Sequence, residues 1–252
     1  MKKSILVFAL AVLIATFGSG TAFAQSSGNF TYGTGGGSTA CVMDSNGNIS
    51  GGVQCKASCT LNLDGTSSCT GQTGTCIGTA IAGIKTSSGN GNVFVVRPSA
   101  VVGLLTDVTV SSKQVNSATG SVSSSALAGV DFQVTVAPQS GQQAPTVIPS
   151  GYITYDARYV QISTNLFQAL ADTCSGINGG CFFTFNQSTV SAHSFDYIVK
   201  GLSSGNYGVT VDWKPSLGFG GTGISEALSC VGPMNMTVQQ NKIFNFNSVN
   251  SF

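Results

Sequence analysis

Apolar residues recur at every second position in several stretches of this chain, and this pattern most constrains the fold. Val130, Phe132, Val134 and Val136 alternate with polar residues, and the stretch from Tyr207 to Trp213 alternates in the same way. Successive side chains of a strand point to opposite faces, so these stretches predict strands with one buried and one solvated face. Segments rich in serine, glycine and proline separate them. The sequence predicts an all-β antiparallel sandwich, immunoglobulin-like or jelly-roll-like.

One stretch departs from this pattern. Ser163 or Thr164 can cap a helix, and apolar residues at helical spacing follow as far as Asp172. We therefore expect one short helix over residues 163–172, crossing an end of the sandwich.

The segment Gly201–Val211 reads GLSSGNYGVTV, in which a leucine and a turn precede Tyr207 and an alternating strand. It resembles the tyrosine corner of immunoglobulin-like sandwiches. The resemblance covers only this segment. It implies a sandwich architecture and points to no particular family.

The N-terminus has the layout of a secretory signal peptide. Lys2 and Lys3 supply a positive start, an uncharged apolar run covers residues 5–17, and Ala22-Phe23-Ala24 provides a cleavage site. We expect the mature chain to begin at Gln25 and to be secreted, to the periplasm or the extracellular space, as in bacterial export. The apolar run is shorter than the roughly 20 residues of a membrane span, so we expect no stable membrane insertion.

All eight cysteines follow this leader. They are Cys41, Cys55, Cys59, Cys69, Cys76, Cys174, Cys181 and Cys230. An even number in an exported chain predicts up to four disulfides. The competing interpretation is a zinc site, but structural zinc sites prefer tighter spacings and need thiolates, which an oxidising compartment removes. We therefore expect disulfides and no metal.

One cysteine pair is predicted directly. Cys174 and Cys181 flank the glycine-rich SGINGG, which lets the chain double back. Closing so short a loop contributes about 2.5 kcal/mol in the chain-entropy model. Five cysteines, an odd number, then remain in the N-terminal part, so Cys230 must reach back to one of them. Which one stays open, because eight cysteines allow 105 pairings.

Residues 25–77 are rich in glycine, serine, threonine and asparagine and lack long apolar runs. Such a segment buries too little apolar surface to offset its ordering entropy, so cross-links or docking must hold it. The chain therefore divides into a signal peptide (1–24), a disulfide-stapled segment (25–77) and a sandwich domain (78–252). Within the segment, residues 60–65 predict a hairpin. Residues 44–48 begin like a calcium-binding loop, but the closing glutamate is missing, so a turn is favoured.

Charge and motifs exclude several partners. Without residues 1–24 the chain keeps eight of its ten Lys and Arg residues and all nine Asp and Glu residues, a net charge of −1. Nucleic-acid binding needs clustered basic residues, so none is expected. The chain has a single histidine and no glycine-rich phosphate loop with a lysine, so no metal site and no cofactor is expected.

The single histidine, His193, lies in SAHSFDY, where Ser, His and Asp stand close together. On a strand, His193 shares a face with Tyr197, whereas Ser194 and Asp196 point the other way, and a triad needs all three groups to converge. We therefore expect a structural histidine and no catalytic site. Carboxylates for glycoside hydrolysis would have to meet in space, from Asp131, Asp156, Asp196, Asp212 and Glu226.

Aromatic side chains provide one candidate ligand site. Tyr152, Tyr155 and Tyr159 cluster beside Arg158, and aromatic rings with a polar tip suit sugar rings. We predict these four as ligand-binding residues, although Tyr152 and Tyr155 fall on opposite faces of an extended strand. Trp213 is in phase with the apolar face of its strand and is predicted to be in the core.

Export, low charge, cross-links and the lack of catalytic groups predict a secreted, non-catalytic protein with a structural, adhesive or cell-surface interaction role. The alternatives are a carbohydrate-binding module that uses residues 152–159, and a secreted hydrolase. The expected partners are glycans, other surface proteins, or a second copy through an edge strand. Residues 244–252 alternate and would offer such an edge.

Overall fold

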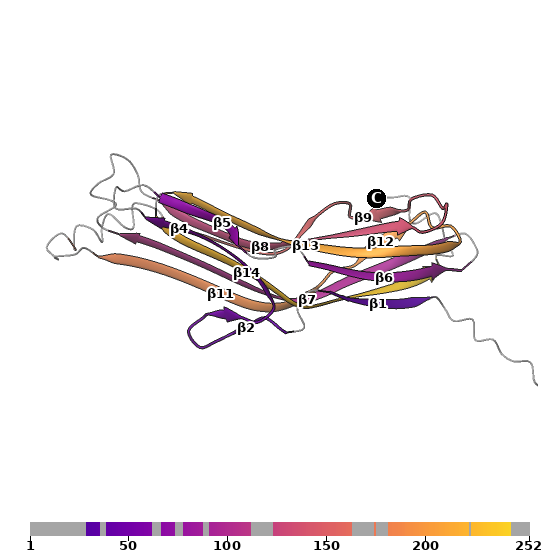
Figure 1. The fold of residues 1–252 in the computed structure, drawn as a ribbon, viewed down its shortest axis with the longest axis horizontal. Coiled ribbons are helices and arrows are strands. Elements are labelled where there is room, and N and C mark those ends of the chain that lie inside the picture. The colour runs from indigo at the N-terminus through magenta and orange to yellow at the C-terminus, as the bar shows by residue number, and fades with distance from the viewer. Residues whose placement is uncertain are drawn as a thin grey trace, which may run out of the picture.

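The structure, a computed structural model, describes residues 29–35, 39–61, 67–73, 78–87, 91–111, 123–162, 174, 181–221 and 223–242. It is built from antiparallel strands, and the prediction of an all-β antiparallel sandwich is confirmed (Figure 1). The strands are β1 (Phe30–Gly35), β2 (Val42–Met43), β3 (Ile49–Ser50), β4 (Val53–Leu61), β5 (Ser67–Thr73), β6 (Gly78–Thr86), β7 (Asn92–Ser111), β8 (Ser124–Pro138), β9 (Thr146–Ile148), β10 (Ile153–Ile162), β11 (Phe182–Ser194), β12 (Tyr197–Lys200), β13 (Gly205–Gly221) and β14 (Ile224–Lys242).

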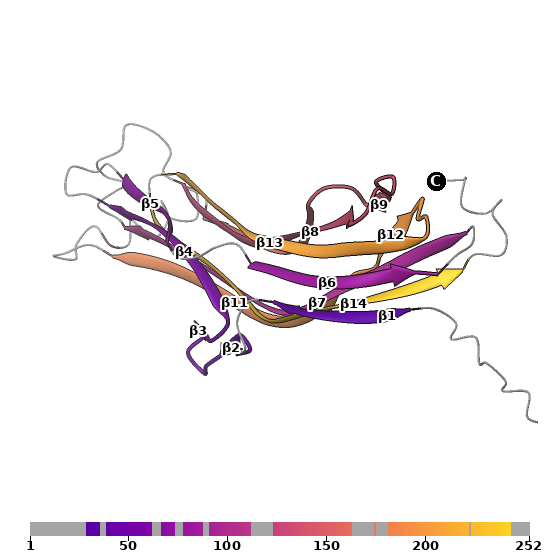
Figure 2. The same cartoon turned by 45° about the vertical axis from the view of Figure 1, so that its right-hand side comes forward.

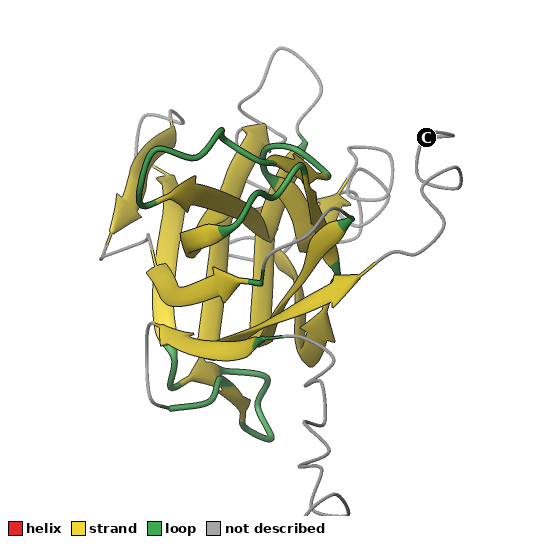
Figure 3. Cartoon of the chain, turned by 90° about the vertical axis from the view of Figure 1, so that its right-hand side faces the viewer, coloured by secondary structure: helices red, strands yellow, loops and turns green. Residues whose placement is uncertain are grey.

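Hydrogen-bonded strands follow the order β10-β8-β13-β6-β1-β14-β7-β12-β9, and β11 and β4 add to β7 and β14. The sheet curls back on itself (Figures 2 and 3). By the strand order, β10, β8, β13 and β6 form one layer, and β14, β7, β11 and β12 form the other. β1 joins the layers along one side. Side chains of both layers meet between them, and the largest fully buried ones are Trp213, Tyr197, Tyr207, Phe94 and Phe132.

The two longest strands each change partner midway. β7 pairs with β12 over its first part and with β11 from Ser99 to Ser111. β14 pairs with β4 as far as Val231 and with β1 from Met234, across an irregularity in its register. This layer therefore consists of two half-sheets laid end to end, which gives the molecule its elongated form (Figure 1).

The alternating segments of the sequence form the strands that carry the core. Tyr207, Val209 and Val211 are fully buried, and Trp213 is 1% exposed, as predicted. Gly78 lies against the Trp213 ring, where a Cβ would come within 1.8 Å of a ring carbon. A glycine is therefore required at the start of β6 to make room for the indole.

The segment before β13 has the hydrogen bonds of a tyrosine corner. The Tyr207 hydroxyl accepts from the backbone N–H of Ser203 at 3.0 Å and donates to its carbonyl oxygen at 3.1 Å. Leu202 is buried beside it. The hydroxyl thus pins the turn that leads into β13, in the manner the resemblance implied.

Three disulfides join described cysteines. Cys174 pairs with Cys181, as predicted, and Cys230 reaches back to Cys41, which confirms the link between the C-terminal strands and the N-terminal segment. The third pair, Cys59 with Cys69, joins directly opposite residues of β4 and β5, the two strands of the hairpin expected around residues 60–65. Cys55 is also disulfide-bonded, and Cys76 lies outside the described residues.

The N-terminal segment contributes to the main sheet and also to its outer face. β1 and β4 both pair with β14. The β2–β3 hairpin packs Cys41 and Ile49 against Leu105 and Leu228, on the side of β7 and β14 that faces away from the core. Disulfide and docking together hold this segment. Whether residue 77 ends a separate unit stays a prediction.

The turn of this hairpin is built around Asp44. Its Oδ1 accepts from the backbone N–H groups of Asn46 and Asn48, and its Oδ2 accepts from the Asn48 side chain. These hydrogen bonds lower the pKa of the Asp44 carboxyl. The carboxylate is used within the turn, as the turn interpretation of this stretch expects.

The leader, the helix expected over residues 163–172 and the C-terminal stretch 244–252 lie outside the described residues. Within the described part, no helix has the length and apolar character needed to cross a membrane.

Candidate functional site

A β-bulge in β10 creates the most concentrated polar cluster between the layers. The register of β10 against β8 shifts between Thr154 and Asp156, so Tyr155 is an extra residue in the strand. A bulge lets two consecutive side chains point to the same side. Tyr155 packs on the core residue Phe132 at 4.2 Å between ring centroids, and Asp156 reaches β11 from the same side. The inward and outward alternation of side chains along β10 is therefore broken at Tyr155, and Asp156 points inward.

Asp156 meets two residues of β11, the edge strand of the other layer. Ser191 Oγ lies 2.6 Å from Nε2 of His193 and donates to Asp156 Oδ2 at 3.2 Å. The same His193 nitrogen lies 3.1 Å from Asp156 Oδ2. Ser191 and His193 share a face because they are two residues apart on a strand.

These groups form a closed triangle and not a relay. In a catalytic triad the serine and the carboxylate contact opposite nitrogens of the imidazole, so that one nitrogen takes the serine proton while the other is held. Here Ser191 and Asp156 compete for the same nitrogen, Nε2. The contact with the serine and the contact with the carboxylate therefore fall on one nitrogen, and the base and orienting roles of a triad are not separated. The arrangement supplies a hydrogen-bonded tie between the two layers.

Two further hydrogen bonds join β10 to the opposite layer on either side of Asp156. Two residues after Asp156 on β10, Arg158 Nη1 donates to Gln187 Oε1 at 3.1 Å. The Tyr155 hydroxyl donates to the carbonyl oxygen of Pro98 at 3.0 Å, and its ring meets His193 edge-on. Burial raises the pKa of Tyr155 far above its usual range, and the phenol stays protonated. We call the contacts of Tyr155, Asp156 and Arg158 with the opposite layer the edge seam.

The four residues predicted to bind a ligand are not gathered into one site. Tyr155 and Arg158 belong to the edge seam. Tyr159 points to the opposite face of β10, where it is 58% exposed and donates to Gln161 Oε1 at 3.1 Å. Tyr152 lies before β10, with Lys214 Nζ 4.1 Å above its ring.

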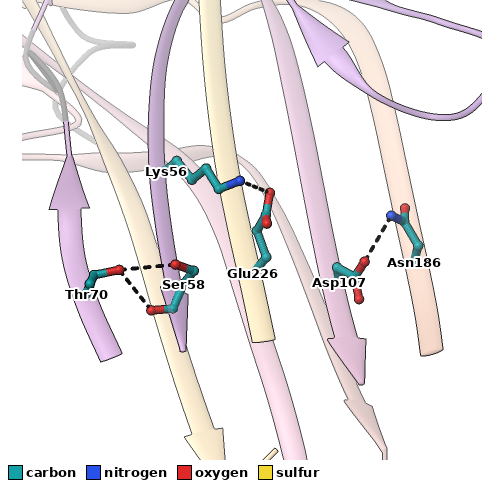
Figure 4. A network of polar contacts seen from close by, with 6 residues as sticks. All are labelled: Lys56, Ser58, Thr70, Asp107, Asn186 and Glu226. Carbon is teal, nitrogen blue, oxygen red and sulfur yellow. Dashed lines mark hydrogen bonds and ion pairs between the residues drawn. The ribbon is translucent and has the colours of Figure 1, made fainter. Parts of the chain in front are cut away.

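One half-sheet consists of β5, β4, β14, β7 and β11 and contains the Cys59–Cys69 disulfide. Its outer face carries a row of polar side chains (Figure 4). The row crosses five strands in register, through Thr70, Ser58, Glu226, Asp107 and Asn186. Lys56 Nζ lies 2.7 Å from Glu226 Oε1, and Asn186 donates to Asp107 Oδ2 at 3.4 Å. Burial, and to a lesser extent the Glu226 carboxylate, raises the pKa of Asp107. Glu226 has the positive charge of Lys56 beside it, whereas Asp107 has the neutral amide of Asn186.

Metal binding has no ready site in the part of the chain that the structure describes. No group of three or more His, Cys, Asp or Glu side chains comes together there. Glu226 and Asp107 are adjacent, but their nearest partners are Lys56 and Asn186, whose nitrogens donate to them.

Sequence reasoning missed two groups that the structure brings together with His193: Asp156 and Ser191. Asp156 is one of five carboxylates that the sequence offers without indicating where they meet, and a bulge leaves no mark in a single sequence. Ser191 was passed over in favour of Ser194, although the two-residue period already placed Ser191 on the same face as His193. Asp196 does point away from the cluster, as expected, and pairs with Arg97 at 2.6 Å.

No family model and no curated protein matches the chain. Among solved structures, an unassembled KI polyomavirus VP1 pentamer has a TM-score of 0.18 and 10% sequence identity, over 89% of this chain and 98% of that chain. So low a TM-score does not establish a shared fold. The strand arrangement and the disulfides of this chain place it in the class of all-β, disulfide-bonded sandwiches.

Proposed function

We propose that this protein is a secreted, non-catalytic β-sandwich with a structural or adhesive role outside the cell. The observation that carries the proposal is a group of exposed apolar side chains on the outer face of β1 and β6. Phe30 is 63% exposed, Tyr32 is 71% exposed and Ile81 is 67% exposed. We call these three residues the outer patch.

Single exposed apolar residues are normal on protein surfaces, whereas adjacent ones mark interaction sites. Gly35 pairs with Ala80, so β1 and β6 are neighbouring strands, and Phe30 and Tyr32 share a face because they are two residues apart on β1. An aromatic ring often covers a glycine of the neighbouring strand. That role is not filled here, because a Cβ at Gly83 would meet no atom within 4 Å. The Tyr32 ring therefore extends into solvent and is available to a partner.

The rest of the chain supports an extracellular scaffold. Disulfides persist in oxidising compartments, and the Cys41–Cys230 pair ties segments 189 residues apart. Only 8% of the residues are charged, so a partner would be held mainly by apolar and hydrogen-bonding contacts. Such a surface suits attachment to a cell envelope or matrix.

The test compares surface binding by matched variants. The chain without residues 1–24 is incubated with source cells and with extracellular matrix material, and bound protein is measured. We expect the triple change Phe30→Ser, Tyr32→Ser and Ile81→Ser to reduce binding at least about tenfold, which corresponds to about 1.4 kcal/mol. The control, Tyr152→Ser with Tyr159→Ser, removes exposed aromatic area elsewhere. Absence of binding by the unmodified chain, or equal binding by both variants, would contradict the proposal.

Carbohydrate binding at β10 is the second proposal. Tyr159 presents an exposed ring whose hydroxyl is held by the amide of Gln161, and a ring beside an amide can stack on and hydrogen-bond to a sugar. A glycan array should then give a signal that Tyr159→Ala abolishes and the outer-patch triple variant retains. Tyr155→Ala is a poor test, because Tyr155 packs on Phe132 in the core.

A further inference from the structure

β11 forms an open edge of the sheet. It pairs with β7 along all thirteen of its residues, from Phe182 to Ser194. Its main chain makes no hydrogen bond to any other described residue. The N–H and C=O groups on the far side of such a strand are available to a further strand.

Four other edges of the described sheet carry features that discourage pairing. β10 has the bulge and two inward charged side chains, Asp156 and Arg158. β9 has only three residues, and Pro149 follows it. β5 has seven residues, includes Gly71 and is irregular in its register with β4. The part of β13 that extends past β6 contains Lys214, Pro215 and glycines.

β11 has none of these devices in its own sequence, and the β2–β3 hairpin contacts it at the side chain of Ser188, which donates to Met43 Sδ at 3.1 Å, and not along its main chain. Its sequence, FFTFNQSTVSAHS, contains no proline, no glycine and no Asp, Glu, Lys or Arg. Phe182 is 68% exposed and Phe185 is 39% exposed at the end of this edge. A long, uncharged strand with exposed aromatic residues is a template for strand addition.

We propose that β11 of one molecule pairs antiparallel with β11 of a second copy. In an antiparallel self-pair each side chain lies opposite one from the same strand, so any charged residue would face a like charge or bias the register. β11 has no permanent charge to oppose the pairing, and the near-zero net charge of the chain adds little repulsion.

This pairing predicts a closed dimer. Two identical antiparallel strands are related by a two-fold axis, so each copy uses the same surface and no free β11 edge remains. The proposal goes beyond the proposed function and does not depend on the outer patch, which lies on β1 and β6.

The experiment measures mass by size-exclusion chromatography with light scattering, at total concentrations from about 1 μM to about 1 mM. One variant carries Phe182→Lys and Ala192→Lys, two exposed positions on β11. The matched control carries Phe30→Lys and Ile81→Lys, the same change of charge on strands that have neighbours on both sides. Near-UV circular dichroism confirms that both variants are folded.

We expect the unmodified chain and the control to form dimers, and the β11 variant to dissociate at concentrations at least about tenfold higher. Hydrogen exchange should also slow in β11 as the dimer forms. A monomer at every concentration, a dimer lost only in the control variant, or a ladder of larger assemblies would each overturn the proposal. A dimer lost only in the control variant would place self-association at the outer patch. None of these outcomes decides whether the outer patch binds cells or matrix, which its own binding test measures.

Discussion

Removal of the Cys41–Cys230 disulfide should destabilise the fold more than removal of Cys59–Cys69. The first closes a loop of 189 residues and the second a loop of 10. In the chain-entropy model these cross-links restrict the unfolded chain by about 5.3 and about 2.7 kcal/mol. The expected difference in the free energy of unfolding between Cys41→Ala/Cys230→Ala and Cys59→Ala/Cys69→Ala is therefore about 2.6 kcal/mol.

Native packing does not offset this difference. Cys41 and Cys230 are both buried, whereas in the second bond Cys59 is buried and Cys69 is exposed, so alanine leaves more buried space at the Cys41–Cys230 bond. Gly52 lies against the longer-range bond, where a Cβ would be 2.6 Å from both sulfur atoms. This close approach adds contacts that are lost with the Cys41–Cys230 sulfurs, which widens the gap.

The assay is equilibrium unfolding in urea under oxidising conditions, followed by the fluorescence of Trp213, the only tryptophan and fully within the core. Both variants should unfold in a single transition, with the long-loop variant at the lower midpoint. Equal losses, or a larger loss from opening the Cys59–Cys69 pair, would refute the reasoning that loop length dominates. Fully reduced protein provides the lower limit of stability.

Three further predictions concern single side chains. Tyr207→Phe removes both hydrogen bonds to the Ser203 backbone and should lower the free energy of unfolding by about 1–3 kcal/mol, measured in urea. Asp156→Asn should change it by no more than about 1 kcal/mol, because the contact with His193 is partly exposed, and a much larger loss would contradict a simple tie. Asp107 has a raised pKa, so the native state holds its proton more tightly than the unfolded chain, and its contribution to stability falls as the pH rises above about 4. Asp107→Asn should remove that fall, which unfolding midpoints measured from pH 4 to pH 7 would show.

Local periodicity explains what could be predicted from the sequence. The segment Tyr207–Trp213 alternates without interruption, and each of its apolar side chains reaches the core. The Cys174–Cys181 pair was equally local, because a short glycine-rich loop joins the two residues. In both cases neighbours in the sequence settle the outcome.

The remainder depended on non-local pairing. Which N-terminal cysteine joins Cys230 is decided by the docking of the β2–β3 hairpin over Leu105 and Leu228, which sequence spacing does not encode. The tyrosines near residue 155 were predicted as one site, but the bulge shifts the phase of β10 and separates them. Asp156 faces inward for the same reason. A one-residue insertion in a strand reverses the face of every side chain beyond it.

That bulge links the two edges of the sandwich. An inward carboxylate loses hydration and needs hydrogen-bonding partners in its place, which Ser191 and His193 provide from β11. The same contacts hold the side chains of β11 toward β10 and leave the main chain of β11 unpaired along its far side. The bulge that discourages strand addition at β10 therefore also orders β11, a thirteen-residue edge strand with no proline and no Asp, Glu, Lys or Arg of its own. If strand addition were selected against at both edges, β11 would be expected to carry a charged residue or a proline as well. It carries no proline and no Asp, Glu, Lys or Arg, and the proposed dimer explains why.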